Sequence, residues 1–142
     1  MRHIAPIARI LLGLTFLVFS LNYFVPFLPP QPPPPAGAMA FAGALVASGL
    51  LTLVKAIEVA AAIALLTNRF VPLALALLAP IVVGIVYFHA VLAPAGMPVA
   101  AFVLVLELVV AWKYRAAFTP MLRARVSPAA VTDAEPEILA VQ

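Results

Sequence analysis

The chain has 142 residues, of which 66% are hydrophobic and only 9% are charged. A soluble domain has about a quarter of its residues charged, so this composition excludes an ordinary soluble domain and indicates an integral membrane protein. The net charge of +3 could suggest nucleic-acid binding, but the basic residues stand at the ends of apolar segments, which is typical of membrane topology. There are no cysteines, which excludes disulfides and thiol–disulfide exchange.

The apolar segments predict an all-α protein, a bundle of four transmembrane helices, because about 20 residues are needed to cross a bilayer. The first span is expected over about residues 4–25. Arg9 lies within it, and this side chain could either extend to the inner headgroups or face the bundle. Residues 26–35 hold seven of the fifteen prolines, which predicts an extended loop on the outer side.

Residues 36–67 then stay largely apolar for 32 positions. As one helix they would extend about 48 Å, well beyond a bilayer core of about 30 Å. We therefore expect a backbone break within about two residues of Gly49. Residues 36–47 would form a short interfacial or re-entrant helix, and residues 49–67 the second span.

Two further spans complete a transmembrane domain over residues 1–118. The third is expected over about residues 70–93 and the fourth over about residues 99–118. Residues 119–142 mix prolines, arginines and late acidic residues, and we expect them to form a mobile cytoplasmic tail.

The basic residues outside the membrane predict the orientation. The loops on one side hold none of them, and the other side is flanked by Arg2, Arg69, Lys113, Arg115, Arg123 and Arg125. Cytoplasmic loops carry the excess of Lys and Arg, so both termini are expected in the cytoplasm.

Four ionisable residues on three spans are expected near the membrane midplane, with formal charges that sum to zero: Arg9, Lys55, Glu58 and Glu107. A rise of about 1.5 Å per residue puts them about 12 to 22 Å from the outer edge. We expect two bridges, Lys55–Glu107 and Arg9–Glu58, although the pairing could be exchanged. Charges inside a membrane commonly mark functional sites, but this quartet could also serve only to set the register of the helices.

His89 is expected towards the outer end of the third span and completes the candidate site. It could form an interfacial hydrogen bond or relay a proton. The only other histidine, His3, belongs near the opposite face, so the two cannot ligate one haem. A metal held by His89 and the two carboxylates is disfavoured by the two nearby cations. The residues therefore identify no metal site, no catalytic group and no particular cofactor.

Several segments together resemble the DoxX family of small four-helix bacterial membrane proteins. Arg9 is followed by Leu12 and Gly13 in the first span. The other matching segments are LVKAIEVAAAIALLTNRFVPLAL at 53–75, APIVVGIVYFHAVLAP at 79–94 and LELVVAWKYRAAF at 106–118. The most specific part is the K-x-x-E of Lys55 and Glu58 with N-R-F-x-P after it.

The resemblance implies a four-helix bundle in the bacterial inner membrane. Members of this family are linked with membrane oxidoreduction. They include the large subunit of an archaeal thiosulfate:quinone oxidoreductase and a membrane oxidoreductase that assembles with detoxifying enzymes. This chain departs from the thiosulfate-oxidising branch because it is short and lacks cysteine.

The sequence leaves two functions open. The chain could be a membrane subunit of a redox or electron-transport system, with the charged residues lining a pocket for a quinone or another small lipophilic ligand. Alternatively, it could be a non-catalytic assembly subunit that packs against other membrane subunits or a second copy of itself. A solute transporter ranks third, because no inverted repeat stands out. A pocket at the charges with room for a ring would favour the first function.

Overall fold

A computed structural model describes residues 4–125, and within this range helices are the only regular secondary structure, as predicted. The expected tail falls mostly on residues 126–142, which lie outside the described residues. The elements in chain order are α1 (Ile4–Phe24), α2 (Ala36–Ala47), α3 (Leu50–Leu66), α4 (Val71–Val91), the short 3-10 helix η1 (Pro94–Gly96), α5 (Met97–Lys113), α6 (Arg115–Phe118) and the 3-10 helix η2 (Thr119–Leu122).

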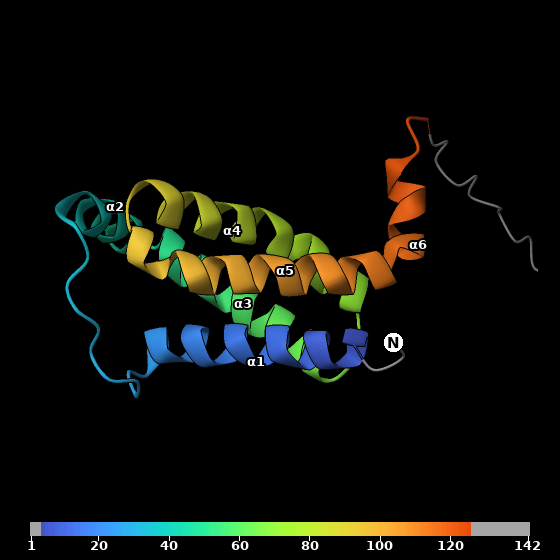
Figure 1. Ribbon diagram of the computed structural model, residues 1–142, viewed down its shortest axis with the longest axis horizontal. Helices are drawn as coiled ribbons and strands as arrows, with labels where there is room; N and C mark the ends of the chain where they lie inside the picture. Colours follow the sequence, from blue (N-terminus) through green and yellow to red (C-terminus); the bar gives the residue numbers. More distant parts are fainter. Residues whose placement is uncertain (1–3, 126–142) are drawn as a thin grey trace, which may run out of the picture.

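Helices α1, α3, α4 and α5 lie side by side along the long axis of the molecule (Figure 1). Helix α1 packs against α3 and α5, and α4 packs against the same two helices. Among the described residues, α1, α4 and the run Pro94–Lys113 are each long and apolar enough to cross a membrane. The pair formed by α2 and α3 would add a fourth crossing if the two count as one broken span. The chain is therefore built as a multi-pass membrane protein.

The predicted break near Gly49 is confirmed. Helix α2 ends at Ala47, α3 begins at Leu50, and the two helices are bent by 82° relative to each other. Gly49 has a φ of 75°, in the left-handed region that glycine adopts without a Cβ clash. As a result, α2 lies across one end of the bundle, beside the end of α4 (Figure 1).

The structure ends the last long helix earlier than the sequence predicted. Helix α5 stops at Lys113, the chain turns at Tyr114, and α6 projects away from the bundle (Figure 1). Arg115 contacts this turn, where its Nη1 donates a hydrogen bond to the carbonyl oxygen of Trp112 at 3.0 Å. Its guanidinium also lies over the Trp112 ring, 5.2 Å from the centroid. Both contacts stabilise the end of α5.

The hydrophobic core occupies the half of the bundle nearest the turn between α3 and α4. In α3 it involves only the last two turns, and no residue before Glu58 in that helix is buried. Its buried members are Ala8, Leu12, Phe16, Ala61, Ala62, Leu65, Val71, Ala74, Leu75, Leu78, Val82, Val103, Leu106 and Val110.

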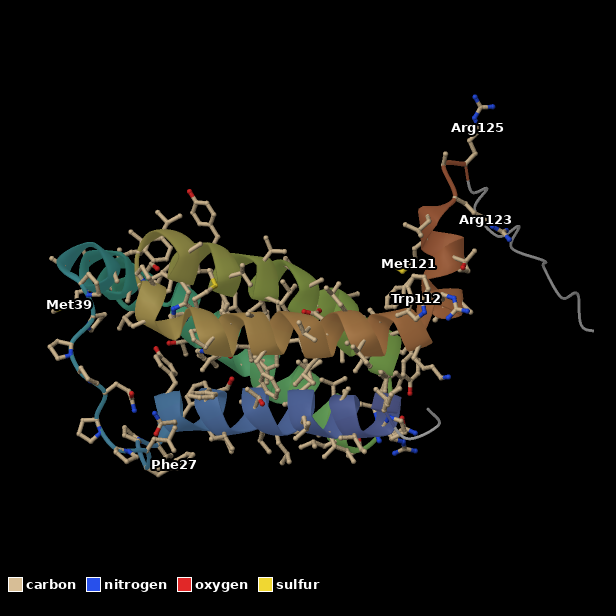
Figure 2. The ribbon with its side chains drawn as sticks, in the orientation of Figure 1. Phe27, Met39, Trp112, Met121, Arg123 and Arg125 are labelled. Carbon is tan, nitrogen blue, oxygen red and sulfur yellow. The ribbon has the colours of Figure 1, made fainter. Side chains whose placement is uncertain are left out.

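Large apolar side chains also cover the outside of the helices (Figure 2). Leu53 of α3, Val83 of α4 and Val105 of α5 are all exposed. Exposed apolar surface on this scale is unfavourable in water and favourable against lipid tails. The outer surface of the bundle therefore suits contact with a lipid bilayer.

Candidate functional site

Lys55 and Glu58 form an ion pair on α3. Their spacing of three residues puts both side chains on one face of the helix, and Lys55 Nζ lies 2.7 Å from Glu58 Oε2. The Glu58 side chain is only 2% exposed and that of Lys55 is 20% exposed. Ser20 of α1 donates a second hydrogen bond to the same Glu58 oxygen, at 2.5 Å. The buried carboxylate is thus held by two donors from two helices, which offsets the cost of its burial.

The other two charges of the expected quartet lie elsewhere. Among the described residues the bridges Lys55–Glu107 and Arg9–Glu58 are not formed, and of the exchanged pairing only Lys55–Glu58 is formed. Arg9 Nη1 donates to the carbonyl oxygen of Leu65, in the last turn of α3. That end of the helix carries the negative pole of its dipole, which attracts a cation. Glu107 is buried on α5, and within residues 4–125 its Oε1 has no hydrogen-bond partner. The four residues therefore occupy three separate places.

A cavity of about 500 Å³ lies between α2, α3 and α4. This volume is within the range of about 300 to 1,000 Å³ that is usual for small-molecule sites. Its polar lining consists of Lys55, Glu58 and His89. Its apolar lining comprises Phe41, Ala42, Leu45, Leu50, Leu51, Val54, Pro80, Ile81, Gly84, Ile85 and Phe88. The structure thus brings three of the five predicted site residues to one cavity.

His89 lies at the end of this cavity, in the last turn of α4. Its Nδ1 is 3.0 Å from the carbonyl oxygen of Ala93, and its ring packs edge-on against Phe88, with ring centroids 5.2 Å apart. Phe88 in turn stacks in a tilted arrangement on Phe41 of α2, at 5.9 Å. An aromatic wall therefore joins α2 and α4 around the cavity.

Arg9 belongs to a second, smaller cavity at the opposite end of the bundle. This cavity measures about 270 Å³ and is lined by Ala5, Pro6, Arg9, Asn68, Lys113 and Tyr114. Tyr114 donates a hydrogen bond to Asn68 Oδ1 at 3.2 Å, and Asn68 has a φ of 56° in the turn that leads to α4. The contacts around Arg9 hold the helix ends together, and Arg9 lies apart from the cavity that holds Lys55, Glu58 and His89.

Three contributors to the site were missing from the sequence prediction. Ser20 shares the inner face of α1 with Phe16, and an inward hydroxyl among apolar residues is a signal that it has a buried partner. Phe41 carried no signal, because its role depends on the bend that brings α2 over the cavity. Gly96 of η1 lies against the His89 ring, and it reaches this ring because the chain folds back after α4.

The described residues contain no group of three or more His, Cys, Asp or Glu side chains that could hold a metal ion. Compared with protein-family models, curated proteins and solved structures, the chain has no match. The site is therefore defined by its own geometry: an apolar cavity with an ion pair and a histidine in its wall.

Proposed function

We propose that this chain is a DoxX-like, multi-pass protein of the bacterial inner membrane that binds a quinone or another small lipophilic ring compound. In this proposal it serves a membrane redox or electron-transport system as one of its subunits. The single observation that supports ligand binding is the cavity of about 500 Å³ with Lys55, Glu58 and His89 in its lining. The redox setting is supported by the resemblance of residues 53–75, 79–94 and 106–118 to the DoxX family.

The lining of the cavity matches the chemistry of such a ligand. The Phe41 and Phe88 rings suit an aromatic or quinoid ring. The Lys55 ammonium has three N–H donors, and the ion pair with Glu58 engages Nζ through a single carboxylate oxygen. The remaining donors can bind a carbonyl oxygen, while the Glu58 carboxylate balances the charge. A neutral ring with a carbonyl group therefore fits better than an anion, which would compete with Glu58.

The position of the cavity suits a ligand that is dissolved in the membrane. Phe41 and Leu50 line the cavity and are also exposed on the outside of the helices. The cavity therefore reaches the apolar surface that suits lipid. A lipophilic molecule would enter sideways from the bilayer and would not have to cross water.

We also propose four crossings, with α2 and α3 together making the second, and both termini in the cytoplasm. Helix α3 has 17 residues, which span only about 26 Å, so it needs a contribution from α2 to match a bilayer core of about 30 Å. In this orientation the cavity lies in the outer half of the membrane.

The decisive experiment replaces Gly84 with a larger residue whose side chain fills part of the cavity. This glycine lines the cavity, and a Cβ added to it would meet nothing within 4 Å. Gly84→Leu should lower the affinity of purified protein for decylubiquinone by at least about tenfold, with no loss of thermal stability. Gly43→Leu is the matched control, because Gly43 lies on α2 outside the cavity lining and its Cβ would also meet nothing within 4 Å. Unchanged binding by Gly84→Leu would show that the cavity is not the site.

The assembly subunit remains the second candidate because of α2. This helix buries only Ala38, and its apolar residues Met39, Phe41 and Val46 are exposed. A neighbouring membrane subunit or a second copy of the chain could cover them. Purification in mild detergent separates the two functions. An assembly subunit should retain large partner proteins equally in wild type and in Gly84→Leu, and it should carry no quinone.

A further inference from the structure

The hydrogen bond of His89 with Ala93 determines which ring nitrogen can meet a ligand. A carbonyl oxygen can only accept a hydrogen bond, so the nitrogen that faces it, Nδ1, carries the proton. In the neutral ring this leaves a lone pair on Nε2. Within residues 4–125, Nε2 has no hydrogen-bond partner, and His89 lines the cavity. Because Nδ1 is engaged and His89 lines the cavity, Nε2 is the ring nitrogen that remains for a hydrogen bond with a ligand.

The turn after α4 holds the ring in this orientation. The Ala93 carbonyl oxygen also accepts a hydrogen bond from the backbone N–H of Gly96, at 3.1 Å, so one oxygen joins the histidine to η1. Gly96 lies directly against the ring: a Cβ at this position would overlap His89 Cε1 and Nδ1 and lie 2.9 Å from Nε2. Any other residue at position 96 would displace the imidazole. Gly96 is thus a positioning residue for His89.

We infer that His89 accepts a hydrogen bond from a ligand hydroxyl, so that the cavity prefers the hydroxylated, quinol form of its ligand to the quinone. This inference rests on the proposed function, because it concerns the same cavity. A quinol hydroxyl can donate to His89 Nε2, and a quinol oxygen can accept from Lys55. A quinone has only acceptors, so it can satisfy Lys55 but leaves Nε2 without a partner.

The size of the preference follows from this one hydrogen bond. A net hydrogen bond in a protein changes affinity by about three- to tenfold, so wild-type protein should bind decylubiquinol that much more tightly than decylubiquinone. His89→Phe keeps a ring of similar size and removes the acceptor. This variant should bind both forms with equal affinity.

Gly96→Ala tests the same inference while His89 itself is left unsubstituted. The added methyl group would displace the imidazole, so the quinol preference should be lost while decylubiquinone still binds. Gly43→Ala adds the same methyl group in open space, and it should keep the full preference. Dissociation constants are measured for both redox forms under anaerobic conditions, and thermal melts verify that each variant is folded.

The outcomes separate this inference from the function on which it rests. If wild-type protein binds both redox forms with equal affinity, or if His89→Phe retains the preference, the role of His89 is overturned and the cavity remains a ligand site. If the wild type binds neither form, the proposed function fails and this inference fails with it.

Discussion

At the scale of single residues, the stability of the buried Glu58 charge depends on the hydrogen bonds that its neighbours donate to it. It is buried, and its two donors are Lys55 and Ser20. Lys55→Met would leave the charge with one neutral donor in a medium of low dielectric constant. We expect a loss of about 2–4 kcal/mol in the free energy of unfolding. Adding Glu58→Gln removes the stranded charge and should recover more than half of that loss. Denaturation in detergent measures both changes.

The matched control combines Lys55→Met with a change at the other buried carboxyl group, Glu107. Glu107 makes no salt bridge with Lys55 in the described residues, so the effects of Glu107→Gln and Lys55→Met should add within about 0.5 kcal/mol. Recovery of stability by the Glu107 change, with none from the Glu58 change, would show that Lys55 is paired with Glu107.

The charged residues also show how far sequence reasoning reaches at this scale. A rise of about 1.5 Å per residue gives the height of a side chain in the membrane. It does not give the rotation of each helix about its axis, and this rotation decides which neighbour a side chain meets. The spacing of three residues alone puts Lys55 and Glu58 on one face of the helix. The carbonyl partner of Arg9 could not be predicted, because it is a backbone group on another helix.

At the scale of elements, the contact between α1 and α3 requires a glycine. A Cβ at Gly13 would lie 2.9 Å from Leu66 Cγ and 3.3 Å from the backbone oxygen of Ala62. A side chain can move away from such a contact more easily than a backbone carbonyl can. Gly13→Leu should therefore force the helices apart and lower the free energy of unfolding by about 1–3 kcal/mol or more.

The control for this change is again Gly43→Leu, which places the same side chain in open space. It should leave stability unchanged or raise it slightly, because leucine favours a helix more than glycine does by about 0.5–1 kcal/mol. Equal effects at positions 13 and 43 would mean that the close approach of α1 and α3 does not matter for stability.

The helix boundaries differ in how well the sequence predicts them. The bend at Gly49 was predictable because 32 largely apolar residues exceed the thickness of a bilayer. The end of α5 at Lys113 was not, because the following residues Arg115–Phe118 are themselves helical and continue the apolar pattern. Arg115 contacts Trp112 at that end, and residue composition does not reveal such a contact.

At the scale of the whole molecule, the bundle divides into two halves of different character. The half near the turn between α3 and α4 contains the packed apolar core, with the smaller cavity beside Arg9 at its end, while the half near α2 holds the larger cavity and its ion pair. The packed half can hold the helices in register, so the other half can leave a cavity open. A small chain can in this way combine a stable fold with a ligand site.

The number of membrane crossings decides on which side of the membrane each terminus of this molecule lies. Figure 2 shows Trp112, Arg123 and Arg125 at the end of the molecule opposite Met39 of α2, and the excess of basic residues should keep that end in the cytoplasm. Reporter fusions after Gln31 and after Ala95 should therefore both report the outside. Reporters fused to the N-terminus and to the C-terminus should both report the cytoplasm.

The two terminal fusions give the sharper test, because they count the crossings by parity. If α2 and α3 together cross the membrane, there are four crossings and the termini share one side. If the bent pair enters and leaves on the same side, only α1, α4 and α5 cross, and the termini lie on opposite sides. Termini on opposite sides would thus make α2 and α3 a re-entrant segment. The cavity would then lie beside a re-entrant loop, and it would no longer be enclosed by two spanning helices.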